Sequence, residues 1–183
     1  SLRRSGFDCD AHGGALMSHA PAALHEIAVR PYANLDPELG ETVARAAAEH
    51  EIDPRILASL DHSPRRLELY LSFYEELVTG PLGSDRLKQV IRRRVAELTE
   101  LREQGELGPH ALPELPAGLA ADECALVRFM DTWAVDHQNV DPGVYDELSD
   151  HFSRAELTEL LWAVAVVFAS ARVGATVGVT AFR

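Results

Sequence analysis

The sequence predicts an all-α protein of six or seven helices with no β-sheet. Two observations carry this prediction: repeated helix-start motifs, and apolar residues that recur at three- and four-residue steps between them. A capping side chain stands directly before a proline at Asp36-Pro37, Asp53-Pro54, Ser63-Pro64 and Asp141-Pro142. The cap oxygen accepts an unpaired backbone N–H, and proline is tolerated at the first helical position. No segment shows a convincing strand-like alternation.

The first three of these motifs predict helices that begin near residues 37, 54 and 64. The apolar stripe of the third helix consists of Leu67, Tyr70, Leu71, Tyr74, Leu77 and Val78. This helix is expected to end at Gly80-Pro81. Ser84 is expected to cap the next helix, which carries an apolar stripe over residues 87–101 and ends at Gly105.

The second half of the chain begins with an irregular segment, 105–118. Three prolines and three glycines limit any helix there to a turn or two. A stripe over residues 126–133 then predicts a shorter helix, and residues 153–156 have capping-box spacing before a last, apolar helix. The apolar run 160–169 is shorter than the ~20 residues of a membrane-spanning helix, so we expect a buried core helix. The β-branched stretch 173–179 is expected to weaken its end.

Length and net charge limit the number of domains and the kinds of partner that the protein is expected to have. The chain has 183 residues, which suits one domain. Lys and Arg number 17 and Asp and Glu 29, and the net charge of −12 argues against nucleic-acid and anionic-membrane partners. The two cysteines, Cys9 and Cys124, do not suggest a disulfide framework or a metal site. We therefore expect reduced thiols in a cytoplasmic protein.

The domain organisation is expected to be simple. Residues 1–16 differ in character from the rest, and Met17 begins a plausible natural start. We interpret residues 1–16 as an upstream extension or an expression remnant. Residues 17–183 are expected to form a single domain, because no linker is long enough to separate two.

Several segments together carry a family resemblance. They are the helix pair at 57–67, the Arg- and Val-rich helix at 82–99, the turn at 117–119, the helix at 123–133 and the start of the apolar helix at 152–157. These resemble the carboxymuconolactone decarboxylase and alkylhydroperoxidase D-like family, from about residue 35 to residue 172. The resemblance implies an alkylhydroperoxidase D-like helical bundle and a homo-oligomer, usually a trimer or hexamer.

The redox branch of this family carries a Glu, a downstream Cys-x-x-Cys pair and a His just beyond it. Two thiols at that spacing can run thiol–disulfide exchange. In the matching register, those positions hold Gln89, Leu101, Gln104 and Gly108. Neither Leu nor Gln forms a thiolate, so this register rules out a peroxidase of that mechanism.

The non-redox branch offers a second register. Many of its members carry a Glu-Tyr-Glu-Trp-Gly-like stretch that leads to a His. Residues 104–110, QGELGPH, resemble it with Gly and Leu in place of the two aromatics. This register needs an insertion of about two residues relative to the first, so the two alignments compete. The loss of both aromatics leaves the substrate preference and the activity open.

His110 and Glu106 are the candidate catalytic residues. A neutral imidazole near pH 7 can give or take a proton, as a lactone decarboxylation requires. Glu106 stands four residues earlier, where a helical turn would let its carboxylate orient the imidazole, although Pro109 makes such a turn irregular. The alternative is a loop histidine that caps a backbone group or faces water.

The candidate substrate-binding residues begin with an arginine run at positions 92–94. Three consecutive helix positions point in three directions, so at most two arginines would face a pocket. There one of Arg92 to Arg94 could hold a substrate carboxylate by a two-point contact, with Arg93 and Arg94 as the selected candidates, and the others would form surface ion pairs. The remaining candidates are Gln89, Gln104, His62 and Trp133. Gln89 could donate a hydrogen bond to a substrate oxygen, whereas Trp133 is more often a core or subunit-contact residue.

No metal and no cofactor is expected, because the histidines lack a metal-binding spacing and no phosphate loop or dinucleotide fingerprint is present. The leading prediction is therefore a cofactor-independent lyase-like enzyme. It would catalyse a decarboxylation or a lactone or enol reaction of a small organic substrate by general acid–base catalysis. The alternative is a catalytically silent ligand-binding or scaffolding oligomer of the same fold. A third hypothesis, a peroxidase using Cys124, is the weakest of the three.

Overall fold

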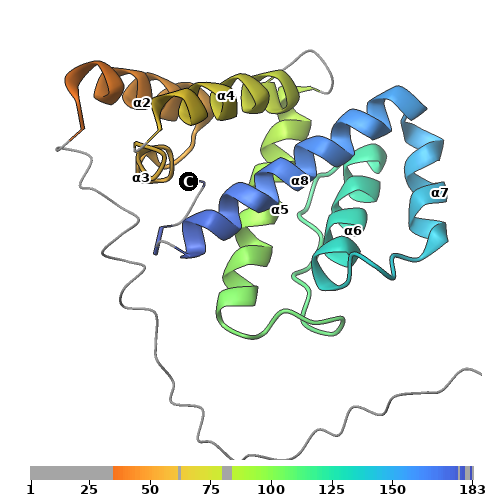
Figure 1. Ribbon diagram of the computed structural model, residues 1–183. Coiled ribbons are helices and arrows are strands. Elements are labelled where there is room, and N and C mark those ends of the chain that lie inside the picture. Colours follow the sequence, from red (N-terminus) through yellow and green to blue (C-terminus); the bar gives the residue numbers. More distant parts are fainter. Residues whose placement is uncertain (1–34, 62, 80–83, 177, 180–181, 183) are drawn as a thin grey trace, which may run out of the picture.

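The computed structural model describes residues 35–61, 63–79, 84–176, 178–179 and 182, which form seven α-helices and no strand (Figure 1). The helices are α2 (Pro37–His50), α3 (Pro54–Ala58), α4 (Pro64–Tyr74), α5 (Asp85–Glu103), α6 (Ala121–Val135), α7 (Pro142–His151) and α8 (Arg154–Thr176). A π-helix, η2 (Glu75–Thr79), continues α4. The all-α prediction is confirmed. The proposed extension 1–16, His62 and the expected stop at Gly80-Pro81 lie outside the described residues.

Helices begin where the sequence motifs place them. The carboxylates of Asp36, Asp53 and Asp141 accept the backbone N–H two residues further on, at 3.1, 2.9 and 2.7 Å. Ser84 caps α5 by accepting the Leu87 N–H at 3.2 Å. Ser63 precedes α4 as predicted, but its side chain makes no capping hydrogen bond. Proline at the first position is sufficient to set that helix start.

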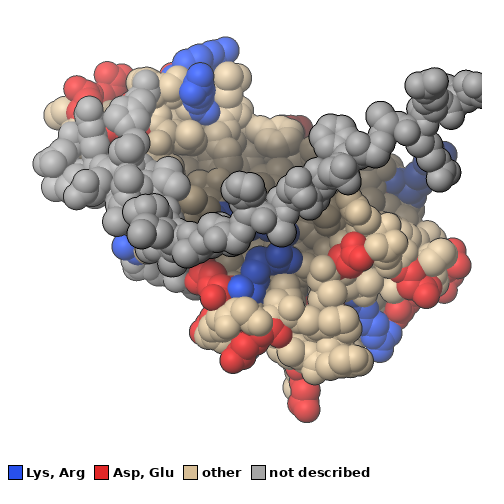
Figure 2. Space-filling model, turned by 60° about the horizontal axis from the view of Figure 1, so that its bottom comes forward, with Lys and Arg blue, Asp and Glu red and all other residues tan. Residues whose placement is uncertain are grey.

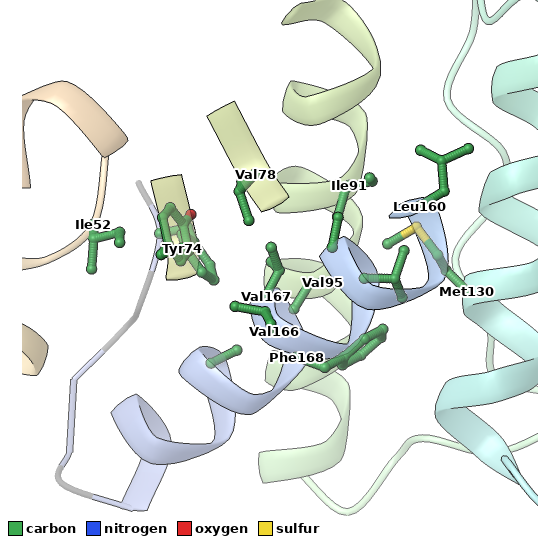
Figure 3. Close-up of a cluster of buried hydrophobic side chains, with 14 of the residues drawn as sticks. Ile52, Tyr74, Val78, Ile91, Val95, Met130, Leu160, Val166, Val167 and Phe168 are labelled. Carbon is green, nitrogen blue, oxygen red and sulfur yellow. The ribbon is translucent and has the colours of Figure 1, made fainter. Parts of the chain in front are cut away.

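The core lies where α8 crosses α5. Figure 1 shows α6 and α7 on one side of these two helices and α2, α3 and α4 on the other. Figure 3 shows the contact, in which Val95 of α5 and Met130 of α6 meet Val167 and Phe168 of α8. All four side chains are buried, and α8 carries apolar residues on most of its faces because it packs against several neighbours.

Helix α8 is the one helix of the described chain whose length and composition would allow it to cross a membrane. Half of its most apolar stretch is buried within the fold, and the core helix of a soluble protein meets the same criteria. The opposite half carries exposed apolar side chains. Trp162 is 56% exposed and meets Phe73 of α4, which is 48% exposed, edge to face at 6.4 Å between ring centroids. Together with Leu69 they form what we term the α4–α8 face.

The irregular segment after α5 is fastened by one buried arginine. The Arg94 guanidinium is 1% exposed and donates to both carboxylate oxygens of Asp131 on α6, at 2.7 and 2.6 Å. It also donates to the backbone carbonyls of Pro113 and Glu114, at 2.8 and 3.3 Å, and to Glu97 at 3.0 Å. A segment without helical hydrogen bonds is thereby held against α5 and α6.

Candidate functional site

The predicted catalytic segment, 104–110, lies on the surface. Helix α5 ends at Glu103, and Gly105 turns the chain with a left-handed φ of 72°. Glu106 and His110 are therefore not on a common helical turn, and both side chains are exposed. Neither side chain makes a hydrogen bond or ion pair with another described residue, and the one such contact of Glu106 is its backbone N–H donating to the Leu101 carbonyl at 2.9 Å. The spacing argument that coupled Glu106 to His110 does not apply to this backbone.

A groove of about 800 Å³ runs along the open side of α5. We call it the α5 groove; its lining is formed by Glu51, Gln89, Arg92, Arg93, Ala96, Glu97, Thr99, Glu100, Glu103, Gln104, Ala171, Val179 and Phe182. Three predicted substrate-binding residues, Gln89, Arg93 and Gln104, therefore lie together on its wall. The predicted catalytic pair does not line it.

A second hollow, of about 410 Å³, lies on the next face of α5. Gln89 and Arg93 line both hollows, and Arg94 lines only this one. Figure 2 shows basic and acidic side chains interspersed on one face of the molecule rather than gathered into a large area of one charge.

The three consecutive arginines point in three directions, as predicted. Arg93 is exposed and pairs with Glu97 one turn later, with 3.3 Å between Nε and Oε1. Arg94 is buried in its ion pair with Asp131, and burial raises the pKa of that carboxyl while the arginine opposes the shift. Arg92 pairs with Glu51 at 2.8 Å at the rim of the groove. Arg94 is thus fully occupied by internal partners, whereas Arg92 and Arg93 face the groove.

The other predicted residues lie apart from the groove. Trp133 is half-buried and packs against Phe168, at 5.2 Å between ring centroids, and against His137 at 6.0 Å. His62 lies outside the described residues. Cys124 is a half-buried free thiol of α6. Among the residues that the structure places, no group of three His, Cys, Asp or Glu side chains is arranged to hold a metal ion.

Sequence reasoning missed a buried polar cluster, which we call the His50 cluster: His50, Tyr74 and Arg92. The imidazole of His50 is 3% exposed and Tyr74 is 0% exposed, and their ring centroids lie 5.5 Å apart. Nδ1 of His50, the Tyr74 hydroxyl and Nε of Arg92 are buried without a hydrogen-bond partner in the described part of the chain. Such groups are rare in native proteins because each loses its water without compensation.

Burial sets the protonation of this cluster. It lowers the pKa of the His50 imidazole from its ordinary 6.5, although Glu49 and Glu75 act in the opposite direction. It raises the pKa of the Tyr74 phenol to about 12, against the effect of the Arg92 charge. At neutral pH the histidine is therefore neutral and the tyrosine is a hydrogen-bond donor.

The lowered pKa of His50 has a consequence for stability. The unfolded chain binds a proton near pH 6.5 and the folded chain only at lower pH, so stability is complete above 6.5 and declines as the pH falls below it. One proton contributes at most ~1.4 kcal/mol per pH unit. We expect His50→Gln to make the free energy of unfolding, measured in urea between pH 7.5 and 5.5, depend less on pH than in the wild type. Equal slopes in the two proteins would contradict this expectation.

The described residues form an all-helical protein with a groove of about 800 Å³ along one helix, α5. No family model, no curated protein and no solved structure matches the chain. The family resemblance therefore stays a prediction, and the function has to be argued from the groove itself.

Proposed function

We propose that this protein binds a small, carboxylate-bearing organic molecule in the α5 groove, as a member of the carboxymuconolactone decarboxylase-like family. The observation that carries the proposal is that Gln89, Arg92 and Arg93 line one groove, with Gln104 about three turns further along on the same wall. The volume of about 800 Å³ falls within the ~300–1,000 Å³ of small-molecule sites. Described helices also overlap the helical segments of the resemblance, at 57–67, 82–99, 123–133 and 152–157.

The charges of the groove are ordered along α5. The two arginines occupy positions 92 and 93, and the acidic residues Glu100 and Glu103 follow towards the end of the helix. Ala171, Val179 and Phe182 supply an apolar wall. This arrangement suits a ligand with a carboxylate at one end, an apolar body and a hydroxyl or amine donor at the other.

Filling the groove tests this proposal. Ala96 lies midway along the α5 wall, so Ala96→Trp is expected to weaken the binding of 4-hydroxybenzoate roughly tenfold or more, which corresponds to about 1.4 kcal/mol. Ligand-observed NMR and calorimetry measure the dissociation constant. Ala48→Trp, at an exposed position of α2, is the matched control and should bind as the wild type does. Equal binding by the Ala96 variant, or none by the wild type, would remove the proposal.

A second candidate function is the cofactor-independent lyase-like enzyme, with His110 as the proton-transfer group. One observation favours it: a hollow of about 460 Å³ is lined by Gln104 and by Ala111, the residue that follows His110. His110→Gln is expected to abolish turnover of a lactone or β-keto acid substrate and to leave the thermal unfolding midpoint unchanged. Undiminished turnover would take His110 out of the mechanism.

We further propose that the protein works as a cytoplasmic homo-oligomer. The α4–α8 face supports this, because Leu69, Phe73 and Trp162 are all about half exposed and lie on two helices that pack together. Tyr70 of α4 and Ser170 of α8 share a hydrogen bond of 2.7 Å that fixes the two helices side by side. Large apolar side chains gathered on a surface in this way are typical of subunit contacts.

A further inference from the structure

The three unpartnered atoms of the His50 cluster come from three different helices. His50 is the last residue of α2, Tyr74 is the last residue of α4, and Arg92 lies on α5. Figure 3 shows Tyr74 between Ile52 on one side and the core residues Val78 and Val167 on the other. Each atom can donate a hydrogen bond: the Arg92 Nε–H always, the tyrosine hydroxyl while protonated, and Nδ1 of His50 in one tautomer.

The backbone at the cluster is irregular. The π-helix η2 begins at Glu75, directly after Tyr74, and single π turns within helices occur frequently at functional sites. Glu51, directly after His50, has a left-handed φ of 54°. Two of the three cluster residues thus adjoin a departure from regular helix.

The cluster meets the α5 groove through one residue. Arg92 is a lining residue of the groove and its Nη1 atom pairs there with Glu51, while its Nε atom is buried; His50 and Tyr74 themselves do not line the groove and lie behind Arg92. His50 and Tyr74 are in ring contact, with 5.5 Å between centroids, and Arg92 lies beside Tyr74, where its charge acts to lower the pKa of both neighbours. Glu51, whose side chain is 57% exposed, lines the groove and pairs with Arg92 at 2.8 Å.

We propose that the His50 cluster is the carboxylate subsite of the α5 groove, and that Glu51 occupies it when no ligand is bound. This inference depends on the proposed ligand-binding function. The ligand carboxylate takes the place of the Glu51 carboxylate on Arg92 and accepts further hydrogen bonds from Tyr74 and His50. Three buried donors without partners then become satisfied, and the exposed Glu51 side chain returns to water.

The sequence left the carboxylate anchor open among Arg92 to Arg94, with Arg93 and Arg94 as the selected candidates. Arg93 is 75% exposed and Arg94 is bound to Asp131, so neither combines access to the groove with buried donors behind it. Arg92, at 12% side-chain exposure, has both. Hydrogen bonds from buried groups to a charged ligand contribute more than exposed ones because less water competes for them.

The test compares 4-hydroxybenzoate with neutral 4-hydroxybenzamide, by calorimetry and by the NMR resonance of the Arg92 Nε–H group. The acid is expected to bind and to shift that resonance, and the amide to bind at least tenfold more weakly. Arg92→Gln should weaken acid binding by roughly ten- to a hundredfold and Tyr74→Phe by roughly tenfold, as expected for hydrogen bonds to a charged group. Glu51→Gln should tighten it severalfold, because the internal competitor is gone.

Two controls separate this inference from the proposed function. Arg65→Gln removes another arginine with a surface glutamate partner, Glu68, but lies outside the groove and should leave binding unchanged. If Arg92→Gln does not fold, the Tyr74→Phe and Glu51→Gln variants still test the subsite. Acid binding that is lost in Ala96→Trp but unchanged in the Arg92, Tyr74 and Glu51 variants overturns the subsite alone. No acid binding by the wild type overturns both.

Discussion

Replacing Arg94 with Met is expected to lower the free energy of unfolding by about 3–5 kcal/mol, the cost of removing one partner from a buried ion pair. Asp131 would keep a carboxylate that is largely buried and has lost both of its arginine hydrogen bonds. The backbone carbonyls of Pro113 and Glu114 would lose their donor as well. Urea unfolding at pH 7 measures the change.

The neighbouring arginine provides the control. Arg93→Met removes an exposed pair with Glu97, and exposed pairs contribute about 0–1 kcal/mol. The double variant Arg94→Met, Asp131→Leu should recover part of the loss, because no uncompensated charge remains buried. A single Arg94→Met variant within ~1 kcal/mol of the wild type would show that the segment after α5 does not depend on this arginine.

Phe73→Glu and Trp162→Glu are expected to convert the proposed homo-oligomer into monomers. Each would place a carboxylate on the α4–α8 face, and burying an unpaired charge costs several kcal/mol. Analytical ultracentrifugation measures the mass in solution. Tyr145→Glu changes another exposed aromatic residue, on α7 and outside this face, and should keep the wild-type mass. A wild-type protein that is monomeric at all concentrations would refute the oligomer.

The helix starts could be predicted from the sequence because they depend on local chemistry. An aspartate before a proline caps the next few residues wherever the rest of the chain lies, and Asp36, Asp53 and Asp141 all do so. The end of α5 near Gly105 could be predicted for the same reason, since glycine adopts the left-handed turn at little cost.

The site was harder to predict because it depends on which helix faces meet. The run of three arginines shows that the side chains diverge, but only the packing of α6 against α5 decides that Arg94 is the buried one. Tyr74 offered a clue, because its place in an apolar stripe predicts burial and a buried hydroxyl needs a partner. His50 offered none, because it ends an otherwise ordinary helix.

The left-handed backbone at Glu51 joins a conformational cost to an electrostatic gain. A residue with a side chain adopts this conformation at a cost of roughly 1–2 kcal/mol, which glycine avoids. Glu51→Gly would relieve that cost, but it would leave the largely buried Arg92 guanidinium without its ion-pair partner and would add freedom to the unfolded chain. A glycine at this turn would therefore relax the backbone and at the same time leave a cation uncompensated.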